Sequence, residues 1–185
     1  KASPFHFLRF LQGASPTDIK SGGYLLQDGL GLWRLARQLT RPPDMEWIVI
    51  PEGMRKEEVA ELTGEKLGWS DEERLAFLSA PKETGYEIQE GIYFQETYLV
   101  SRDEKGFQFA RRMINNFNDK FSEYSADFIE QDIKWTTGIK LASIVQREAA
   151  GGDEKLIAGI LWNRLFDDIK LDIDATVQYA RDTDL

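Results

Sequence analysis

The sequence contains no cysteine and only one histidine, His6. Without cysteine there are no disulfides, no thiol nucleophile and no zinc or iron–sulfur site built on Cys. A single histidine cannot form a multi-histidine metal site, and nothing around His6 indicates a Ser–His–Asp triad. We therefore expect no metal and no cofactor, which leaves proton-transfer chemistry to Asp, Glu, Tyr and Lys.

Long apolar runs are also missing. No stretch of about 20 apolar residues forms a membrane span, and no charged-then-apolar leader indicates a signal peptide. The chain opens at Lys1 without a methionine and stops at Leu185. We interpret it as a fragment of a longer protein.

Positive charge is in deficit. The 23 Lys and Arg residues face 32 Asp and Glu residues, which gives a formal charge of −9 at pH 7. This balance argues against a nucleic-acid-binding protein, because phosphates must be neutralised by cations. It also argues against adsorption to anionic lipid. The hydrophobic content of 42% is sufficient for a folded core.

Short apolar runs alternate with helical patterns in the first part of the chain. We predict strands at 24–26 and 47–50, and helices at 30–39 and 55–67. These elements predict a small sheet within residues 1–68, with helices packed against it. A capping box at Ser70–Glu73 predicts a further helix that ends before a loop at 80–85.

Longer helical stripes follow. A second capping box, Ser101–Glu104, predicts the start of a long helix through residue 124. Further helices are predicted at 134–149, 153–166 and 175–180. We therefore assign the α+β class, with a small α/β module at 1–80 and a mostly helical domain at 81–185.

Glu148 is the candidate for proton chemistry. It follows Ile144 by four residues and Val145 by three, which predicts that its carboxylate lies on the apolar face of the 134–149 helix. Burial and the negative end of the helix dipole would both favour the protonated acid, as a general acid near neutral pH requires. The alternative is a structural Glu paired with a cation such as Arg164.

Several segments together resemble the endolytic murein transglycosylases of the MltG (YceG-like) family. The matching segments are KSGGY at 20–24, IPEGM at 50–54, EGIYFQETY at 90–98, LASIVQRE at 141–148, IAGILWNRL at 157–165 and LDIDATVQY at 171–179. Family members read approximately KAGxY, IPEGM, EGxxFPDTY, LASIVEKET, VFxNRL and LQTDPTVxY there. Gln95, Gln146 and Ala175 depart from this pattern, and the family's YNTY and GLPPGPI segments do not occur before Leu185.

The resemblance implies a small LysM-like module followed by a helical catalytic domain. It further implies cleavage of peptidoglycan between N-acetylmuramic acid and N-acetylglucosamine, with a 1,6-anhydro end and Glu148 as the catalytic residue. Family members are anchored at the outer face of the cytoplasmic membrane and are associated with peptidoglycan synthases. We expect no nucleic-acid partner, and contact with the membrane only through an anchor that this chain lacks.

Other polar residues are weaker candidates for binding the glycan. They are Asn163, Arg164, Asp174, Thr176, Glu96 and Tyr98. Arg164 is equally explained as a structural cation, and Asp174 as the N-cap of the 175–180 helix.

Two other functions stay open at this point. The chain could be a non-catalytic, LysM-like glycan-binding protein with a helical scaffold. It could also be a hydrolase that uses a second acid among Asp153, Glu154 and Asp174.

Overall fold

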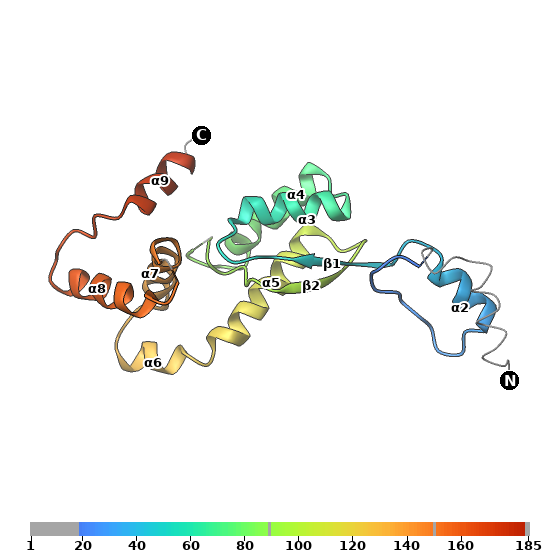
Figure 1. The fold of residues 1–185 in the computed structure, drawn as a ribbon, viewed down its shortest axis with the longest axis horizontal. Helices are drawn as coiled ribbons and strands as arrows, with labels where there is room; N and C mark the ends of the chain where they lie inside the picture. Colours follow the sequence, from blue (N-terminus) through green and yellow to red (C-terminus); the bar gives the residue numbers. More distant parts are fainter. Residues whose placement is uncertain (1–18, 89, 150, 184–185) are drawn as a thin grey trace. The chain divides into compact units, whose positions relative to one another are not determined.

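The structure, a computed structural model, describes residues 19–88, 90–149 and 151–183. His6 lies outside these residues. The described elements are mainly helices, with a small antiparallel sheet, as the α+β class predicts (Figure 1). They are α2 (Leu32–Leu39), β1 (Met45–Val49), α3 (Lys56–Leu67), α4 (Asp71–Glu83), β2 (Thr97–Ser101), α5 (Gly106–Phe121), α6 (Ser125–Glu130), α7 (Trp135–Glu148), α8 (Glu154–Phe166) and α9 (Asp174–Thr183).

Two compact units make up the chain, and neither is continuous in sequence. The first unit consists of Lys1–Pro51, Glu57–Leu78 and Gln95–Phe109. The second unit consists of Glu52–Lys56, Ser79–Phe94 and Ala110–Leu185. The first unit therefore draws on residues from both sides of position 80.

The sheet of the first unit pairs β1 with β2. Ile48 lies opposite Tyr98, and Trp47 lies opposite Leu99. Ile48 and Tyr98 face the core, whereas Trp47 is exposed. The predicted strand at 47–50 is thus confirmed, but the prediction of a sheet confined to residues 1–68 is wrong because its partner is 97–101.

The predicted strand at 24–26 is also wrong. Only Gly23 pairs with the sheet, through an isolated bridge to Met45 with N–O distances of 3.1 and 2.9 Å. Tyr24 turns away, and its hydroxyl donates to the carbonyl oxygen of Lys20 at 2.8 Å. After this single bridge the chain leaves the edge of β1, so residues 24–26 form no strand.

Aromatic rings fill the core of the first unit. Phe77 and Phe109 are fully buried, with ring centroids 6.0 Å apart. Tyr98 packs edge-on against Phe109 at 5.4 Å, and Trp69 lies 5.8 Å from Phe77. Because Trp69 donates its indole N–H to the carbonyl oxygen of Glu104, its polar atom is satisfied inside the core.

Two predicted boundaries need correction. Pro81 does not end the preceding helix but lies buried within α4. Proline has no N–H to donate to the preceding turn, and α4 ends two residues after it. Ser101 does not cap a helix: it pairs with Met45 as the last residue of β2, its hydroxyl contacts Asp103, and α5 begins only at Gly106.

The second unit has two hydrophobic clusters. In the first, Ile92, Ile114 and Phe117 are buried, with Trp135 among the rings around them. In the second, Leu141, Leu161 and Ile173 join α7, α8 and the start of α9. The prediction that the chain beyond residue 100 is mainly helical is therefore confirmed.

Candidate functional site

The candidate site is built on α7, α8 and the start of α9. Their shared cluster of Leu141, Leu161 and Ile173 is edged by partly buried side chains: Ile144, Val145, Ile157, Trp162, Leu171 and Ala175. Four sequence-predicted residues, Asn163, Arg164, Asp174 and Thr176, lie in or beside these packed segments. A single apolar cluster therefore fixes the backbone from which they project.

Glu148 is the last residue of α7 and is exposed. It continues the face of Leu141, Ile144 and Val145, but the cluster ends one turn before it. Among the residues that the structure describes, no hydrogen bond or ion pair reaches its carboxylate. The prediction that the Glu148 carboxylate is buried is thus wrong, and the alternative that it pairs with Arg164 is not supported either.

Glu154, six residues further on, has a different environment. Its two carboxylate oxygens accept the Gly152 N–H at 3.0 and 3.1 Å. This backbone hydrogen bond, followed by one to its own N–H, lowers the pKa of Glu154 below its ordinary value of 4.5. Because Glu154 is held ionised and bound to the turn after α7, it is poorly suited to donate a proton.

Arg164 fastens a loop rather than facing Glu148. Its Nη1 donates to the carbonyl oxygens of Leu171 at 2.6 Å and Lys170 at 3.4 Å. These bonds hold the segment that leads from α8 into α9. The structural explanation of Arg164 is the one its geometry supports.

The other candidates of the second unit are exposed. The Asn163 side chain lies on the surface of α8, and the backbone carbonyl oxygen of Asn163 accepts the Asp167 N–H at 3.0 Å. Asp174 opens α9, and the Thr176 hydroxyl donates to the carbonyl oxygen of Ile173 at 2.7 Å. Of the four candidates on α8 and α9, Arg164 and Thr176 use their side chains to bind backbone carbonyl oxygens. The side chains of Asn163 and Asp174 make no hydrogen bond among the described residues.

The two remaining candidates lie in the first unit. Tyr98 is buried in β2 against Phe109, so it packs the core and does not present its ring to a ligand. Glu96 is exposed just before β2, and its carbonyl oxygen accepts the Ile50 N–H at 2.9 Å. The structure therefore does not support a binding role for Tyr98.

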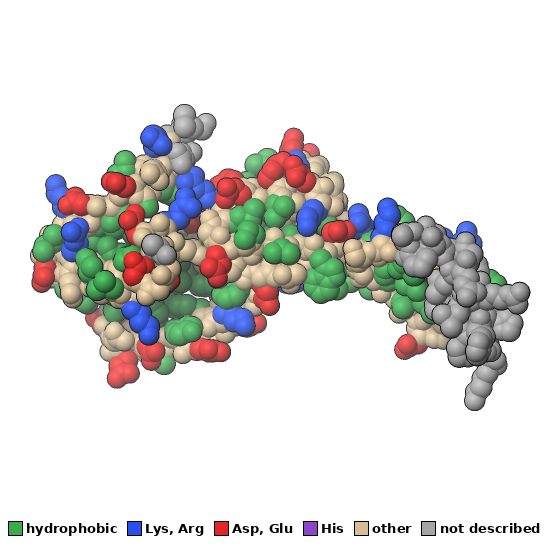
Figure 2. Space-filling model, in the orientation of Figure 1, with side chains coloured by type: hydrophobic (Ala, Val, Ile, Leu, Met, Phe, Trp, Pro, Cys, Tyr) green, Lys and Arg blue, Asp and Glu red, His purple; other side chains and the backbone are tan. Residues whose placement is uncertain are grey.

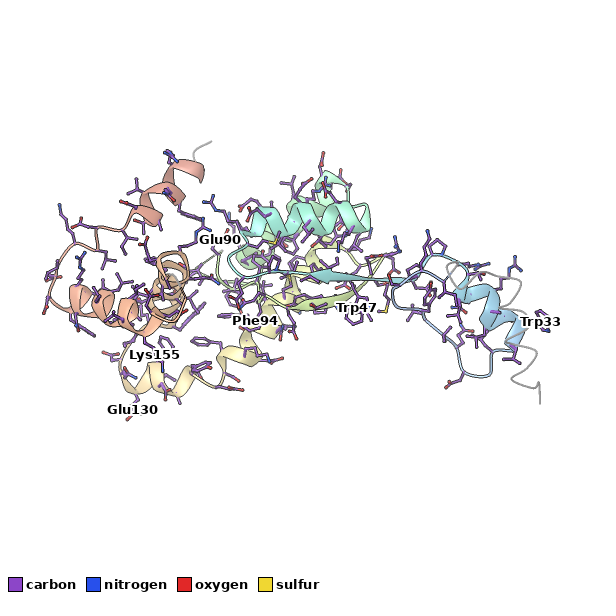
Figure 3. The ribbon with its side chains drawn as sticks, viewed as in Figure 1. Trp33, Trp47, Glu90, Phe94, Glu130 and Lys155 are labelled. Atoms are coloured by element: carbon purple, nitrogen blue, oxygen red, sulfur yellow. The ribbon has the colours of Figure 1, made fainter. Side chains whose placement is uncertain are left out.

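Sequence reasoning missed three side chains that join distant segments of the second unit, those of Arg55, Glu90 and Tyr179. The Arg55 guanidinium lies over the Tyr179 ring, 5.0 Å from its centroid. Glu90, labelled in Figure 3, accepts the Lys56 N–H at 3.4 Å with its Oε1. All three lie in or next to segments that carry the family resemblance, but their spacing in the sequence gives no reason to pair them.

The described residues include no group of three or more Asp, Glu, His or Cys side chains arranged to hold a metal ion. Within the same residues, no helix has the length and hydropathy needed to cross a bilayer. The site is therefore a set of carboxylate, amide and guanidinium groups on a helical support.

The chain is similar to proteins of one family over nearly its whole length. The model of the YceG-like family matches residues 2–184. Two curated relatives from Streptococcus pneumoniae, of serotype 2 strain D39 and of strain R6, are both named endolytic murein transglycosylase and are 25% identical over 198 residues. These matches cover 89% of this chain but 36% of each relative, so the chain spans about a third of their length.

A solved structure has the same fold. It is the crystal structure of a yceG-like protein from Listeria monocytogenes, with a TM-score of 0.66 and 21% sequence identity. The match covers 96% of this chain and 66% of the other. At this identity the likeness establishes the fold.

Proposed function

The chain belongs to the YceG-like family, and from that membership we propose that it cleaves peptidoglycan glycan strands as an endolytic lytic transglycosylase. The proposal is supported by the names of the relatives from S. pneumoniae. The observation that carries it is Glu148, an exposed carboxylate at the end of α7 with no partner among the described residues. This residue lies in the segment that resembles the family's catalytic segment.

In the proposed reaction Glu148 acts first as an acid and then as a base. It protonates the glycosidic oxygen that leaves from C1 of N-acetylmuramic acid. The resulting carboxylate then accepts the proton of the 6-hydroxyl of the same sugar, whose oxygen attacks C1. The products are an N-acetylglucosamine end and a 1,6-anhydro-N-acetylmuramic acid end, and no water is consumed. Because the 6-hydroxyl is held near C1 of the same sugar, it can act as the nucleophile, and no second catalytic carboxylate is needed for that step.

An exposed carboxylate can serve as the acid once the substrate covers it. A glycan strand lying against the end of α7 would remove water from around Glu148. The substrate would thus supply the burial that the free protein lacks.

We assign supporting roles to other parts of the chain on the same basis. The succession β1, α3, α4 and β2 in the first unit is our candidate for the LysM-like module that the resemblance implies. A peptidoglycan substrate places the protein in the cell envelope, at the outer face of the cytoplasmic membrane if it is anchored as its family is. Peptidoglycan synthases are the proposed partners.

Substitution of Glu148 by Gln tests the proposal, with the complete gene product and purified glycan strands. Gln keeps the shape but cannot donate or accept the proton. General acid–base catalysis typically contributes about 10²–10⁴-fold. Because both proposed steps use this one group, we expect a loss at or beyond the upper end of that range.

Glu130→Gln provides a matched control, since Glu130 is an exposed Glu that ends α6 as Glu148 ends α7 (Figure 3). It should retain wild-type cleavage. A folded Glu148→Gln protein that cleaves at the wild-type rate would reject Glu148 as the catalyst. Absence of cleavage by the wild type would favour the binding-only alternative.

A further inference from the structure

Positive charge is concentrated in one part of this acidic chain. Residues 19–44 carry four cations and two carboxylates, and one of these, Asp44, accepts the Leu25 N–H at 2.9 Å; the whole chain has a formal charge of −9. The cations are Lys20, Arg34, Arg37 and Arg41, and all are exposed. Figure 2 shows Lys and Arg side chains beside hydrophobic ones in the part of the first unit that holds α2.

The exposed face of α2 combines these cations with an aromatic ring. Trp33, Arg34 and Arg37 lie on one side of the helix, whereas Ala36 is buried on another. Trp33 is 68% exposed, and Figure 3 shows it projecting outward from α2. Trp33 and Arg37 are four residues apart, so their side chains are neighbours on the helix.

The preceding loop adds apolar side chains to the same region. Leu25 and Leu26 are 59% and 51% exposed. The loop is fixed to α2 because Gln38 donates to the Leu25 carbonyl oxygen, and because the Tyr24 hydroxyl lies 3.4 Å from the Arg41 carbonyl oxygen. We use the name α2 patch for the exposed cationic and apolar side chains of α2 and the segments joined to it: Lys20, Leu25, Leu26, Trp33, Arg34, Arg37 and Arg41.

We propose that the α2 patch binds the surface of an anionic phospholipid bilayer. Guanidinium groups bind phosphate headgroups through charge-assisted hydrogen bonds. Tryptophan prefers the boundary between headgroups and acyl chains, and exposed leucines can enter the same layer. A soluble polyanion would use the cations but would leave Trp33, Leu25 and Leu26 exposed to water, so a membrane fits the whole patch better.

The negative charge of the chain does not prevent this contact. At physiological ionic strength the Debye length is about 8 Å, so carboxylates further than this from the bilayer are largely screened. The electrostatic interaction with the membrane therefore depends mainly on the charged groups of the patch itself. For this surface the proposal differs from the expectation, drawn from the net charge, that the chain does not adsorb to anionic lipid.

Co-sedimentation of the 185-residue chain with vesicles tests the proposal. We expect binding to vesicles that contain phosphatidylglycerol, weakening as salt is added, and little binding to pure phosphatidylcholine. One cation near an anionic surface contributes roughly a fivefold gain in binding. Arg34→Ala with Arg37→Ala should thus weaken binding about 25-fold.

Variants of the aromatic residue separate a membrane from other polyanions. Trp33→Ala should weaken binding to the anionic vesicles, and Trp33→Phe should restore most of it. If Trp33→Ala binds as the wild type does while the double arginine variant does not, the patch is a site for soluble polyanions and the proposal is wrong.

The matched control removes two exposed cations outside the patch, Lys120 on α5 and Lys155 on α8, by substitution with Ala. It should bind as the wild type does. An equal loss in this control would show that overall charge, and not the α2 patch, governs binding, and would overturn the proposal. So would failure of the folded wild-type chain to bind phosphatidylglycerol vesicles.

Discussion

Two glutamates near the end of α7 show how the environment divides their roles. Glu154 is bound to the Gly152 N–H and its pKa is lowered. Glu148 is exposed and has no hydrogen-bond or ion-pair partner within the described residues. A carboxylate that must exchange a proton with a substrate has to be free to meet it, so the arrangement favours Glu148 as the acid.

Periodicity predicted the face on which Glu148 lies but not its depth. The spacing from Leu141, Ile144 and Val145 places Glu148 on their side of α7, and these three residues do belong to one cluster. Burial depends on what other segments cover the end of the helix, and local spacing holds no information about that. The same limit explains why the contact between Arg55 and Tyr179 was missed.

Arg164 provides a prediction at the residue scale. Arg164→Ala should lower the free energy of unfolding by about 2 kcal/mol, because the hydrogen bonds from a charged group to the carbonyl oxygens of Leu171 and Lys170 are lost. Urea unfolding measures the change. Lys155→Ala, an exposed change on the same helix, should stay within about 0.5 kcal/mol of the wild type.

A different result would show that Arg164 acts on the substrate. If Arg164→Ala keeps its stability but loses glycan cleavage, its side chain acts on the glycan and not on the loop before α9.

At the scale of elements, the sequence predicted the helices well but did not predict which strands pair with each other. The apolar stripes of α5 and α7 are local patterns, and both helices form close to the predicted residues. The pairing of β1 with β2 joins segments that are far apart in sequence. Ser101 matched a capping box, but β2 takes it into the sheet, so tertiary pairing overrides a local helix signal.

Gly106 gives a prediction for the contact between α4 and α5 within the first unit. A Cβ at this buried position would overlap the carbonyl oxygen of Glu73, which belongs to the backbone and cannot turn aside. Gly106→Ala should therefore destabilise the protein by about 3 kcal/mol, at the upper end of the cost of overpacking. Urea unfolding provides the measurement.

Gly159 on α8 is the matched control, because a Cβ there would meet nothing within 4 Å. Gly159→Ala should stabilise the helix by about 0.5–1 kcal/mol, since alanine loses less backbone entropy than glycine. Equal effects of the two substitutions would contradict the packing described for Gly106.

The stability of the contact between α4 and α5 should depend on pH through Glu73. Its Oε2 accepts the Gly106 N–H at 2.8 Å, and Lys105 lies 3.3 Å from its Oε1. The backbone hydrogen bond, with a smaller effect of Lys105, lowers the pKa of Glu73 below its ordinary value of 4.5. The stability it contributes is therefore fully present above 4.5 and is lost as the pH falls through the lowered value.

Glu73→Gln tests this charge effect. The variant should have a lower urea midpoint than the wild type at neutral pH, and the difference should shrink in acid, where Glu73 is protonated in both states. A difference that is constant with pH would show that the charge of Glu73 is not involved.

At the scale of the whole molecule, charge and function are distributed unevenly. The second unit holds the proposed catalytic residue, whereas the first unit holds the sheet, the candidate LysM-like module and the α2 patch. The composition gives only the net charge of the whole chain and not the charge of each part. The net charge of −9 therefore did not predict the exposed cations of the α2 patch. The boundary predicted at residue 80 was also misleading, because the sheet pairs β1, before residue 80, with β2, after it.

The most direct test of the central claim is the mass of the product made in heavy-oxygen water. We predict that the complete gene product releases glycan ends one water lighter than a reducing end, with no label, because the 6-hydroxyl of the substrate closes the ring. A second carboxylate that activated water would instead give reducing ends that carry the heavy oxygen. Labelled reducing ends would contradict the transglycosylase mechanism and identify a hydrolase.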